Sequence, residues 1–357
     1  MSSTHSLYSM TRDARRLVVV DLGFLGDTVH LIPPLWELRS HYPGAEIHVI
    51  TTPLGASVLT LVPCVDRVWT VKLGGPRRPA LQRLREQTQL IRSLRKQRFD
   101  LAINFTGADR TLILMGLIGA RHRVARMPDR WHFWNPLLFR HWVPQPDRQQ
   151  PVFEQRRAVL AVCGIPLDGE ARFDLSISDK ARQWATANIP FGAVHLSLSA
   201  STPLKEWALD QWIKLGRLLT AGPQPVPVVV TCGTNPREQT RVQEFIDGVR
   251  SDRVTRVVEP SLDQFAALLG CCRVHVGSDS GPLHLAMALG IPTVALFRRY
   301  FGIEEWLPRG AQHQHVAVEC ACSGQRKPPC LGRPSADCLA GITPETVLAM
   351  VARVLST

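Results

Sequence analysis

The segment 23–28 (GFLGDT) places a carboxylate where it could act as a general base. It directly follows an apolar run, and Gly23 and Gly26 let the backbone turn tightly. Asp27 would lie where this loop meets a helix. There it either caps the helix by accepting N–H hydrogen bonds, the better-supported interpretation from local sequence alone, or abstracts a proton from a substrate. The pattern is not G-x-G-x-x-G, so a dinucleotide fingerprint is poorly supported.

The segment 277–284 (GSDSGPLH) has the composition of an anion-binding helix start. Small residues such as Ser280 and Gly281 leave backbone N–H groups accessible, and the helix dipole favours negative charge there. Asp279 would cap the helix or accept hydrogen bonds from substrate hydroxyls. His284, taken alone, is typical of a partly buried structural histidine. The segment as a whole predicts a diphosphate cradle.

Two further polar loops follow expected strands. In 197–207 (SLSASTPLKEW), hydroxyls including that of Ser201 precede Lys205. Hydroxyls and an ammonium group suit a leaving diphosphate, although a polar turn with a surface lysine is equally compatible. In 231–238 (TCGTNPRE), Glu238 would accept from a ribose hydroxyl or a base amino group, or would be a first-turn acid stabilised by the helix dipole.

The elements that must position these loops form two series of short β-rich runs alternating with helical patterns. Such alternation predicts βαβ units and parallel sheets, hence an α/β fold of two doubly wound halves. The first series of strands is 17–21, 46–51, 67–71, 100–104 and 123–125; the second is 193–197, 226–231, 255–258, 273–277 and 293–297. Helices are expected at 208–219, 262–269, 283–289 and 344–355.

A length of 357 residues favours two domains. The proline-rich segment 130–190 connects the two series, and we place the boundary within 178–190. The expected domains are therefore 15–185 and 186–342, followed by a C-terminal helix in 343–357. Together the four loops place polar groups at corresponding strand ends in both halves, as a cleft between two such domains requires.

The charge balance is basic: 42 Lys and Arg against 30 Asp and Glu give 42 − 30 = +12. Such a surface favours anionic partners. The densest basic segment, 77–98, has Leu81, Leu84, Leu90, Ile91 and Leu94 at helical spacing. It is either a solvated helix face, which we favour, or a surface that approaches anionic headgroups or an acidic acceptor.

Neither a signal peptide nor a membrane span is predicted. Asp21 interrupts the first apolar run, and the best internal run, 112–120, is too short to cross a bilayer. We expect a cytoplasmic protein that is at most peripheral to a membrane. No nucleic-acid motif is present, and the basic residues lack interleaved aromatics, so nucleic acid is not an expected partner.

Nine cysteines in a cytosolic chain are expected to be reduced. Five lie in apolar surroundings typical of small core residues: Cys64, Cys163, Cys232, Cys271 and Cys272. The other four, Cys320, Cys322, Cys330 and Cys338, form a separate group. Their spacing, C-x-C followed by two gaps of seven residues, differs from the C-x₂₋₄-C pairs of most zinc sites. We therefore favour reduced structural thiols over metal binding.

Three blocks in this order resemble the bacterial lipopolysaccharide heptosyltransferase family of glycosyltransferases, which have the GT-B fold. They are LGFLGDTVHLIP near the start, SASTPLKEW in the middle and GSDSGPLHLAMALGIPTVALF later. The resemblance runs from about Leu17 to the C-terminus. One departure is that the usual H-P-G-A opening of the middle block reads HLSL here, at 195–198.

The resemblance implies two Rossmann-like halves, the first binding the acceptor and the second the nucleotide sugar, with the last helix crossing back onto the first. Asp27 matches the family's general base, and Lys205 the lysine that neutralises the diphosphate. Asp279 matches the acid that holds the donor sugar. The remaining implied donor contacts are Ser201, Glu238, Ser280, Gly281 and His284.

The leading hypothesis is thus an inverting, metal-independent transfer of heptose from ADP-heptose to the lipopolysaccharide core at the inner face of the inner membrane, with no cofactor. Asp27 and Lys205 come from different halves, and domain closure would bring them to the same sugar. One alternative is a relative that uses another nucleotide sugar or another surface polysaccharide. A second, of another class, is a non-catalytic module that binds nucleotide sugars or polyanions.

Overall fold

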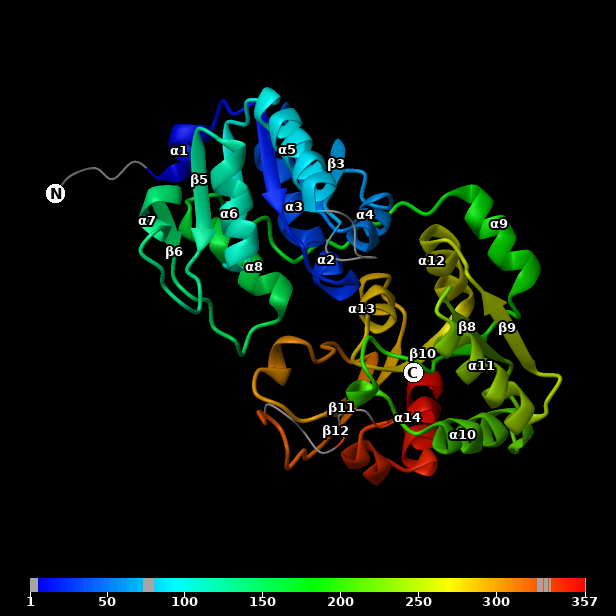
Figure 1. The fold of residues 1–357 in the computed structure, drawn as a ribbon. Coiled ribbons are helices and arrows are strands. Elements are labelled where there is room, and N and C mark those ends of the chain that lie inside the picture. Colours follow the sequence, from blue (N-terminus) through cyan, green and yellow to red (C-terminus); the bar gives the residue numbers. More distant parts are fainter. Residues whose placement is uncertain (1–5, 73–79, 326–329, 331–332, 334, 357) are drawn as a thin grey trace. The chain divides into compact units, whose positions relative to one another are not determined.

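The computed structural model describes residues 6–72, 80–325, 330, 333 and 335–356. The chain forms two compact units, Met1–Asp174 and Leu175–Thr357 (Figure 1). The boundary lies earlier than the expected 185. Much of the segment that we expected to connect the halves belongs instead to the first unit, because β6 (His141–Val143) joins its sheet and α8 (Val152–Val162) packs on α3 (Ile32–His41).

The first unit contains a six-stranded sheet with the order β3-β2-β1-β4-β5-β6. All neighbouring strands are parallel, which is the arrangement of a doubly wound dinucleotide-type sheet. The central strands read as apolar runs because both faces of the sheet are covered by helices. The strands before β6 are β1 (Arg16–Val20), β2 (Glu46–Thr51), β3 (Arg67–Thr70), β4 (Leu101–Asn104) and β5 (His122–Arg126).

Helices cover this sheet, and the basic segment forms one of them, α5. Leu94 is buried in the core and Leu90 packs against it, whereas Leu81 and Leu84 are exposed. The expected helix is confirmed over Ala80–Lys96, while Arg77 and Arg78 lie outside the described residues. The helices of this unit are α1 (Leu7–Thr11), α2 (Leu25–Val29), α3, α4 (Pro53–Leu59), α5 (Ala80–Lys96), α6 (Asp109–Ile118), α7 (Asn135–Leu138) and α8.

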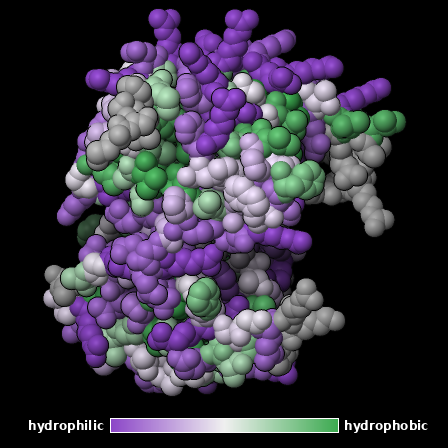
Figure 2. All heavy atoms as spheres, turned by 90° about the vertical axis from the view of Figure 1, so that its left-hand side faces the viewer, coloured by the Kyte–Doolittle hydropathy of each residue, from purple (hydrophilic) through white to green (hydrophobic). Residues whose placement is uncertain are grey.

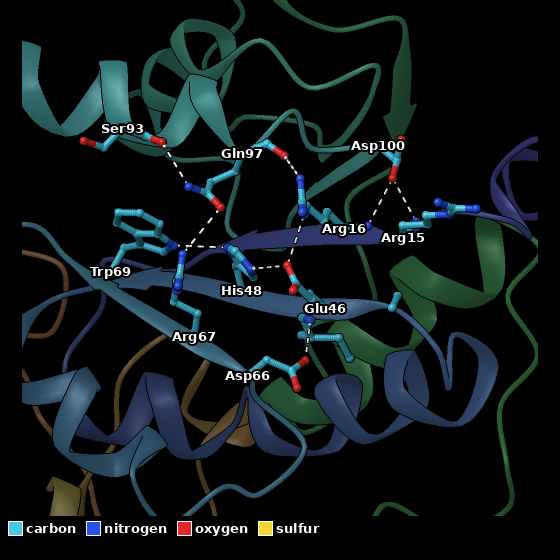
Figure 3. Close-up of polar contacts among 12 residues, drawn as sticks. Arg15, Arg16, Glu46, His48, Asp66, Arg67, Trp69, Ser93, Gln97 and Asp100 are labelled. Atoms are coloured by element: carbon cyan, nitrogen blue, oxygen red, sulfur yellow. Dashed lines mark hydrogen bonds and ion pairs between the residues drawn. The ribbon is translucent and has the colours of Figure 1, made fainter.

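Side chains near the amino ends of the first strands form hydrogen bonds and ion pairs with one another (Figure 3). Asp100 accepts hydrogen bonds from the backbone N–H groups of Arg15 and Arg16, at 2.8 and 3.1 Å. The Arg16 side chain pairs with Glu46 at 3.1 Å, and Trp69 contacts His48 at 3.2 Å. These contacts connect the amino-terminal ends of the strands. The polar loops that could take part in chemistry lie at the other end of the strands, after their carboxyl-terminal residues.

The second unit repeats the same plan. Its six strands have the order β12-β11-β10-β7-β8-β9 and are all parallel. Numbered within the unit, this is again the order 3-2-1-4-5-6, so two Rossmann-like halves are confirmed. The strands are β7 (Ala193–Ser197), β8 (Val228–Cys232), β9 (Val254–Val258), β10 (Cys272–Ser278), β11 (Thr293–Arg298) and β12 (His313–Val318).

The last helix, α14 (Pro344–Ser356), packs within the second unit rather than leaving it as expected. Val347, Met350, Val351 and Val354 belong to a core cluster built on β7, β8, β10 and β11. The helix contacts α10, β10, β11 and β12. The other helices of this unit are α9 (Asp179–Asn188), α10 (Leu209–Ala221), α11 (Pro236–Val249), α12 (Leu262–Cys271) and α13 (Gly281–Ala288), with η1 (Pro203–Lys205), η2 (Ile303–Glu305) and η3 (Asp337–Gly341).

Within the described residues, no helix combines the length and hydropathy needed to cross a bilayer. On the face shown in Figure 2, hydrophilic side chains predominate and hydrophobic ones form separate patches.

Candidate functional site

Asp27 lies in the first turn of α2, immediately after β1. Its Oδ2 accepts the backbone N–H of Phe24 at 2.9 Å, so the side chain does hold the start of the helix. The carboxylate is 27% exposed, which leaves it accessible to a substrate. A methyl group at Gly23 would lie 2.4 Å from the Asp27 Cβ, which explains why glycine is needed there. Gly26 is buried within α2. The cap and the base interpretations are therefore compatible in one residue.

Arg156 of α8 links two carboxylates at this strand end, and sequence reasoning missed it. Its Nη2 lies 2.9 Å from Asp21 and 3.9 Å from the Asp27 carboxylate. Its Nη1 donates to the Asp27 carbonyl oxygen at 2.6 Å. Asp21 is fully buried, and its other oxygen accepts the N–H of Gly23 at 2.8 Å. Arg156 thus fixes the position of the Asp27 loop and brings positive charge near its carboxylate.

In the second unit, Lys205 and Asp279 form a close ion pair. Lys205 Nζ lies 2.6 Å from Asp279 Oδ2, which also accepts the Tyr300 hydroxyl at 3.1 Å. His284 Nε2 lies 3.5 Å from the other carboxylate oxygen. Burial alone would raise the pKa of Asp279, but the hydrogen bond from His284 and the charge of Lys205 outweigh it and hold that pKa well below its usual range. Asp279 is therefore an anion in a polar cluster.

The head of α13 is arranged as an anion site. Ser280 is the N-cap and Gly281 the first helical residue, so the helix begins where β10 ends. Ser280 is 9% exposed, and within the described structure its hydroxyl has no hydrogen-bond partner. A buried hydroxyl without a partner is costly unless a ligand satisfies it. A phosphate at this helix start would accept from it and from the first backbone N–H groups.

Glu206 braces the loop that carries Lys205. It is fully buried, accepts the N–H of Ala200 at 2.8 Å and pairs with Arg237. Arg241, also buried, donates to the carbonyl oxygens of Leu198 and Trp207 at 2.9 and 2.5 Å. These contacts fix both ends of the loop after β7. Sequence reasoning did not identify this function for Glu206, because its charged partner Arg237 lies on another element, α11.

Two expected donor contacts lie at strand ends of the same sheet. Ser201 is exposed in the turn after β7. Glu238 occupies the first turn of α11, and its Oε2 accepts the N–H of Gly233 at 3.1 Å. The structure thus gives Glu238 the role of holding the loop after β8. Its expected role as a nucleotide contact is untested and stays a prediction.

Beneath these loops lies a buried pair of histidines. His195 of β7 and His275 of β10 approach Nδ1 to Nδ1 at 2.8 Å, and His195 Nε2 lies 3.1 Å from the Thr231 hydroxyl. Burial lowers the pKa of His195 to about 3 and also lowers that of His275. Both rings are therefore neutral near pH 7, with a single proton between the two facing nitrogens.

The cysteines divide as expected with one exception. Cys64, Cys163, Cys232 and Cys272 are buried, whereas Cys271 is partly exposed, so its assignment to the core was wrong. No disulfide is formed by the nine thiols.

Two Rossmann-like units with polar loops at the carboxyl ends of their strands have the architecture of GT-B glycosyltransferases. The family model for glycosyltransferase family 9 (heptosyltransferase) matches residues 87–334. The chain therefore belongs to glycosyltransferase family 9, and it is an enzyme of the glycosyltransferase class.

Individual relatives agree with this assignment. Lipopolysaccharide heptosyltransferase 3 of Escherichia coli is 25% identical over 288 residues, covering 77% of this chain and 81% of the relative. The fold matches E. coli ADP-heptose lps heptosyltransferase II with a TM-score of 0.74 and 19% identity, covering 96% and 98% of the two chains. E. coli heptosyltransferase WaaC, solved with ADP-2-deoxy-2-fluoro heptose, matches with a TM-score of 0.71 and 18% identity, covering 95% and 99%.

Proposed function

We propose that this enzyme transfers heptose from ADP-heptose onto the lipopolysaccharide core, with inversion at the anomeric carbon. The observation that carries the proposal is the cluster of Lys205, Asp279 and the head of α13, which joins a cation, an anion and an unsatisfied helix start. This combination suits a sugar diphosphate, whose phosphates need positive charge while the sugar offers hydroxyls. In support, two of the similar proteins described above are named lipopolysaccharide heptosyltransferases.

The donor is held by the second unit. The diphosphate accepts from the N-terminal N–H groups of α13 and from Ser280, and the dipole of α13 favours its charge. Lys205 neutralises charge that builds on the leaving ADP, so the reaction needs no metal ion. Asp279 accepts hydrogen bonds from hydroxyls of the donor sugar.

Asp27 is the general base. The acceptor hydroxyl oxygen attacks the anomeric carbon, the bond between that carbon and the diphosphate oxygen breaks, and the hydroxyl proton passes to Asp27. The ADP departs with the electron pair of the broken bond. Attack on the face opposite the leaving group inverts the anomeric centre. The partial exposure of Asp27 is consistent with such access.

The acceptor is anionic and lipid-linked, and the enzyme contacts the cytoplasmic face of the inner membrane peripherally. In support, the exposed leucines Leu81 and Leu84 lie on α5 together with basic side chains such as Arg85 and Arg92. Apolar and cationic groups on one helix favour a surface of anionic headgroups.

The decisive experiment is calorimetric binding of ADP-heptose beside UDP-glucose, GDP-mannose and ADP, without added metal, followed by a transfer assay on a core acceptor that lacks the terminal heptose. We expect selective binding of ADP-heptose and formation of the glycosylated core. If a different nucleotide sugar bound instead, that nucleotide sugar would be assigned as the donor. If the folded protein bound no nucleotide sugar, the proposed glycosyl transfer would be wrong, and a polyanion-binding module would be favoured.

A further inference from the structure

Arg156 is a charged side chain in the interior of the first unit. It belongs to α8, which packs on α3, and its side chain is 4% exposed. A guanidinium group remains charged in proteins, so taking it out of water is costly unless anions and carbonyl oxygens surround it. Well-packed apolar side chains often stabilise such a position equally well. Stability of the fold therefore does not by itself account for an arginine here.

The contacts of Arg156 converge on the loop between β1 and α2. Nη2 lies 2.9 Å from Asp21 Oδ2, and Nη1 donates to the main-chain carbonyl oxygen of Asp27 at 2.6 Å. The other oxygen of Asp21 accepts the N–H of Gly23 at 2.8 Å, and Asp27 Oδ2 accepts that of Phe24 at 2.9 Å. One arginine and two carboxylates thus hold the loop at both of its ends.

The charge of Arg156 acts on the Asp27 carboxylate without a direct hydrogen bond. Nη2 lies 3.9 Å from Asp27 Oδ1, which is beyond hydrogen-bonding distance but within the range of strong electrostatic attraction. Because the guanidinium does not occupy Oδ1 with a hydrogen bond, it stabilises the anionic carboxylate and leaves that oxygen able to take up a proton. The Asp27 side chain is 27% exposed, so solvent screens the attraction only in part.

The charge balance around Asp27 depends on Arg156. The fully buried Asp21 contacts the same nitrogen, so the two carboxylates lie near each other. Neighbouring like charges favour protonation of one carboxylate, and a cation in contact with both opposes it. His30, at the end of α2, is another ionisable group of this region, and its ring stacks on Phe153 of α8. The helix α4, which also packs on α2, has no ionisable side chain.

The next residue of α8, Arg157, has different partners. It is equally buried, and it pairs with Glu37 of α3 at 2.7 Å and with Glu154 at 2.9 Å. Its Nη2 also donates to the carbonyl oxygen of Gly169 at 2.6 Å. Arg157 therefore connects helices and a loop on another side of α8, whereas Arg156 contacts the loop that carries Asp27.

We propose that Arg156 is a positioning residue of the transfer reaction, which holds the Asp27 carboxylate in place and keeps it ionised until the acceptor hydroxyl arrives. This inference rests on the proposed role of Asp27 as general base. Arg156 is buried and acts through Asp27 rather than on the substrate. When the acceptor proton moves to Asp27, Arg156 remains paired with Asp21, so the step leaves no uncompensated buried cation.

A titration that needs no substrate tests the electrostatic part of the proposal. The ¹³C signal of the Asp27 carboxyl carbon, assigned by its loss in Asp27→Asn, is followed against pH. We expect its midpoint to lie about one pH unit higher in Arg156→Gln than in wild type, because the nearby positive charge is lost. Arg156→Lys and Arg157→Gln should stay near wild type. His30 is present in every variant, so its own titration does not produce a difference.

An unchanged midpoint in Arg156→Gln would overturn the proposal, whether or not the enzyme transfers heptose. Kinetics then test the positioning part. In Arg156→Gln, kcat should fall about 10²-fold through misplacement of the base, while the donor Kd stays as in wild type. Arg156→Lys should lose part of kcat, because an ammonium group lacks the planar fork that reaches both Asp21 and the Asp27 carbonyl oxygen.

Arg157→Gln is the matched control, since it removes an equally buried, ion-paired arginine from the same helix. It should lower Tm but retain kcat per folded molecule. Equal losses of kcat in Arg156→Gln and Arg157→Gln would show that Arg156 is only structural. If Arg156→Gln did not fold, Arg156→Lys would decide, and an undiminished kcat there would rule out positioning by the guanidinium. If wild type transferred no sugar, the proposed function would be wrong, and the titration would decide whether Arg156 acts on Asp27.

Discussion

Lys205 Nζ lies 2.6 Å from Asp279 Oδ2, so the cation expected to meet the diphosphate is already paired with the acid expected to meet the sugar. The pairing joins the loop after β7 to the loop after β10. It also holds Asp279 ionised, because Lys205 and His284 offset the effect of burial on the Asp279 pKa. A bound donor must therefore share Lys205 with Asp279.

Replacing Lys205 by Met should reduce the transfer rate by about 10²–10³-fold, as for the loss of one group that stabilises a leaving charge. Because His284 and Tyr300 still contact Asp279, the protein should remain folded. Steady-state kinetics with matched thermal melts would check this. Lys205→Arg, which keeps the charge, is the control and should lose less activity. Similar losses in both variants would show that geometry rather than charge dominates.

The roles of Asp27 as general base and as helix cap can be distinguished by comparing the variants Asp27→Asn and Asp27→Ala. Asp27→Asn retains an oxygen that accepts the Phe24 N–H but cannot take a proton, so transfer should be abolished while donor affinity and Tm change little. Asp27→Ala should lose transfer and also about 1 kcal/mol of stability. Kinetics, calorimetry and melting curves provide the readouts. Substantial transfer by Asp27→Asn would remove Asp27 from the role of base.

Gly23→Ala should impair catalysis through Asp27. The added Cβ would lie 2.4 Å from the Asp27 Cβ, a distance at which the aspartate must move. We expect a clear fall in kcat with donor binding in the second unit retained. Gly44→Ala, where nothing lies within 4 Å of the new Cβ, is the control and should behave as wild type. Unchanged kcat in Gly23→Ala would mean that Asp27 needs no fixed position.

Acid should destabilise the protein through the buried histidine pair. The pKa of His195 is about 3 in the fold and about 6.5 when unfolded. Between these values the unfolded state binds the extra proton. The contribution of His195 to stability is therefore complete above about pH 6.5 and falls below it, at up to about 1.4 kcal/mol per pH unit.

Urea denaturation at several pH values would measure this dependence. His48 and His313 contribute in the same direction, because burial lowers their pKa values as well. The informative comparison is thus between wild type and a His195 variant, in the slope of the unfolding free energy against pH. His195→Gln should reduce the slope below pH 6.5, and an unchanged slope would contradict the assignment.

Most strands could be predicted from sequence because central parallel strands are apolar runs, and β2 and β7 match their expected bounds. Two of the four edge strands, β6 and β12, were missed for physical reasons, whereas the edge strands β3 and β9 were expected. β6 has three residues, and β12 (HQHVAV) mixes polar and apolar side chains because an edge strand has one neighbour. Neither gives the continuous apolar signal of a buried strand.

The part of the candidate site that lies within the sequence motifs could be predicted. Asp27, Lys205 and Asp279 are found at the strand ends expected for them. Arg156 was not predictable, because an arginine within a helix gives no local sign that it will meet Asp21 across the fold. The packing of α14 was also missed, since its apolar face says that it is buried but not against which unit.

The unpartnered hydroxyl of Ser280 makes the start of α13 selective among ligands. Because this hydroxyl is buried and has no hydrogen-bond partner among the described residues, a ligand that accepts from it gains a hydrogen bond without first displacing an internal partner. A molecule of similar shape that lacks an oxygen at that point would leave the group as costly as before. Ser280 thus provides selectivity mainly by lowering the affinity for ligands that leave its hydroxyl unpaired, even where its hydrogen bond to the correct ligand adds only modest affinity.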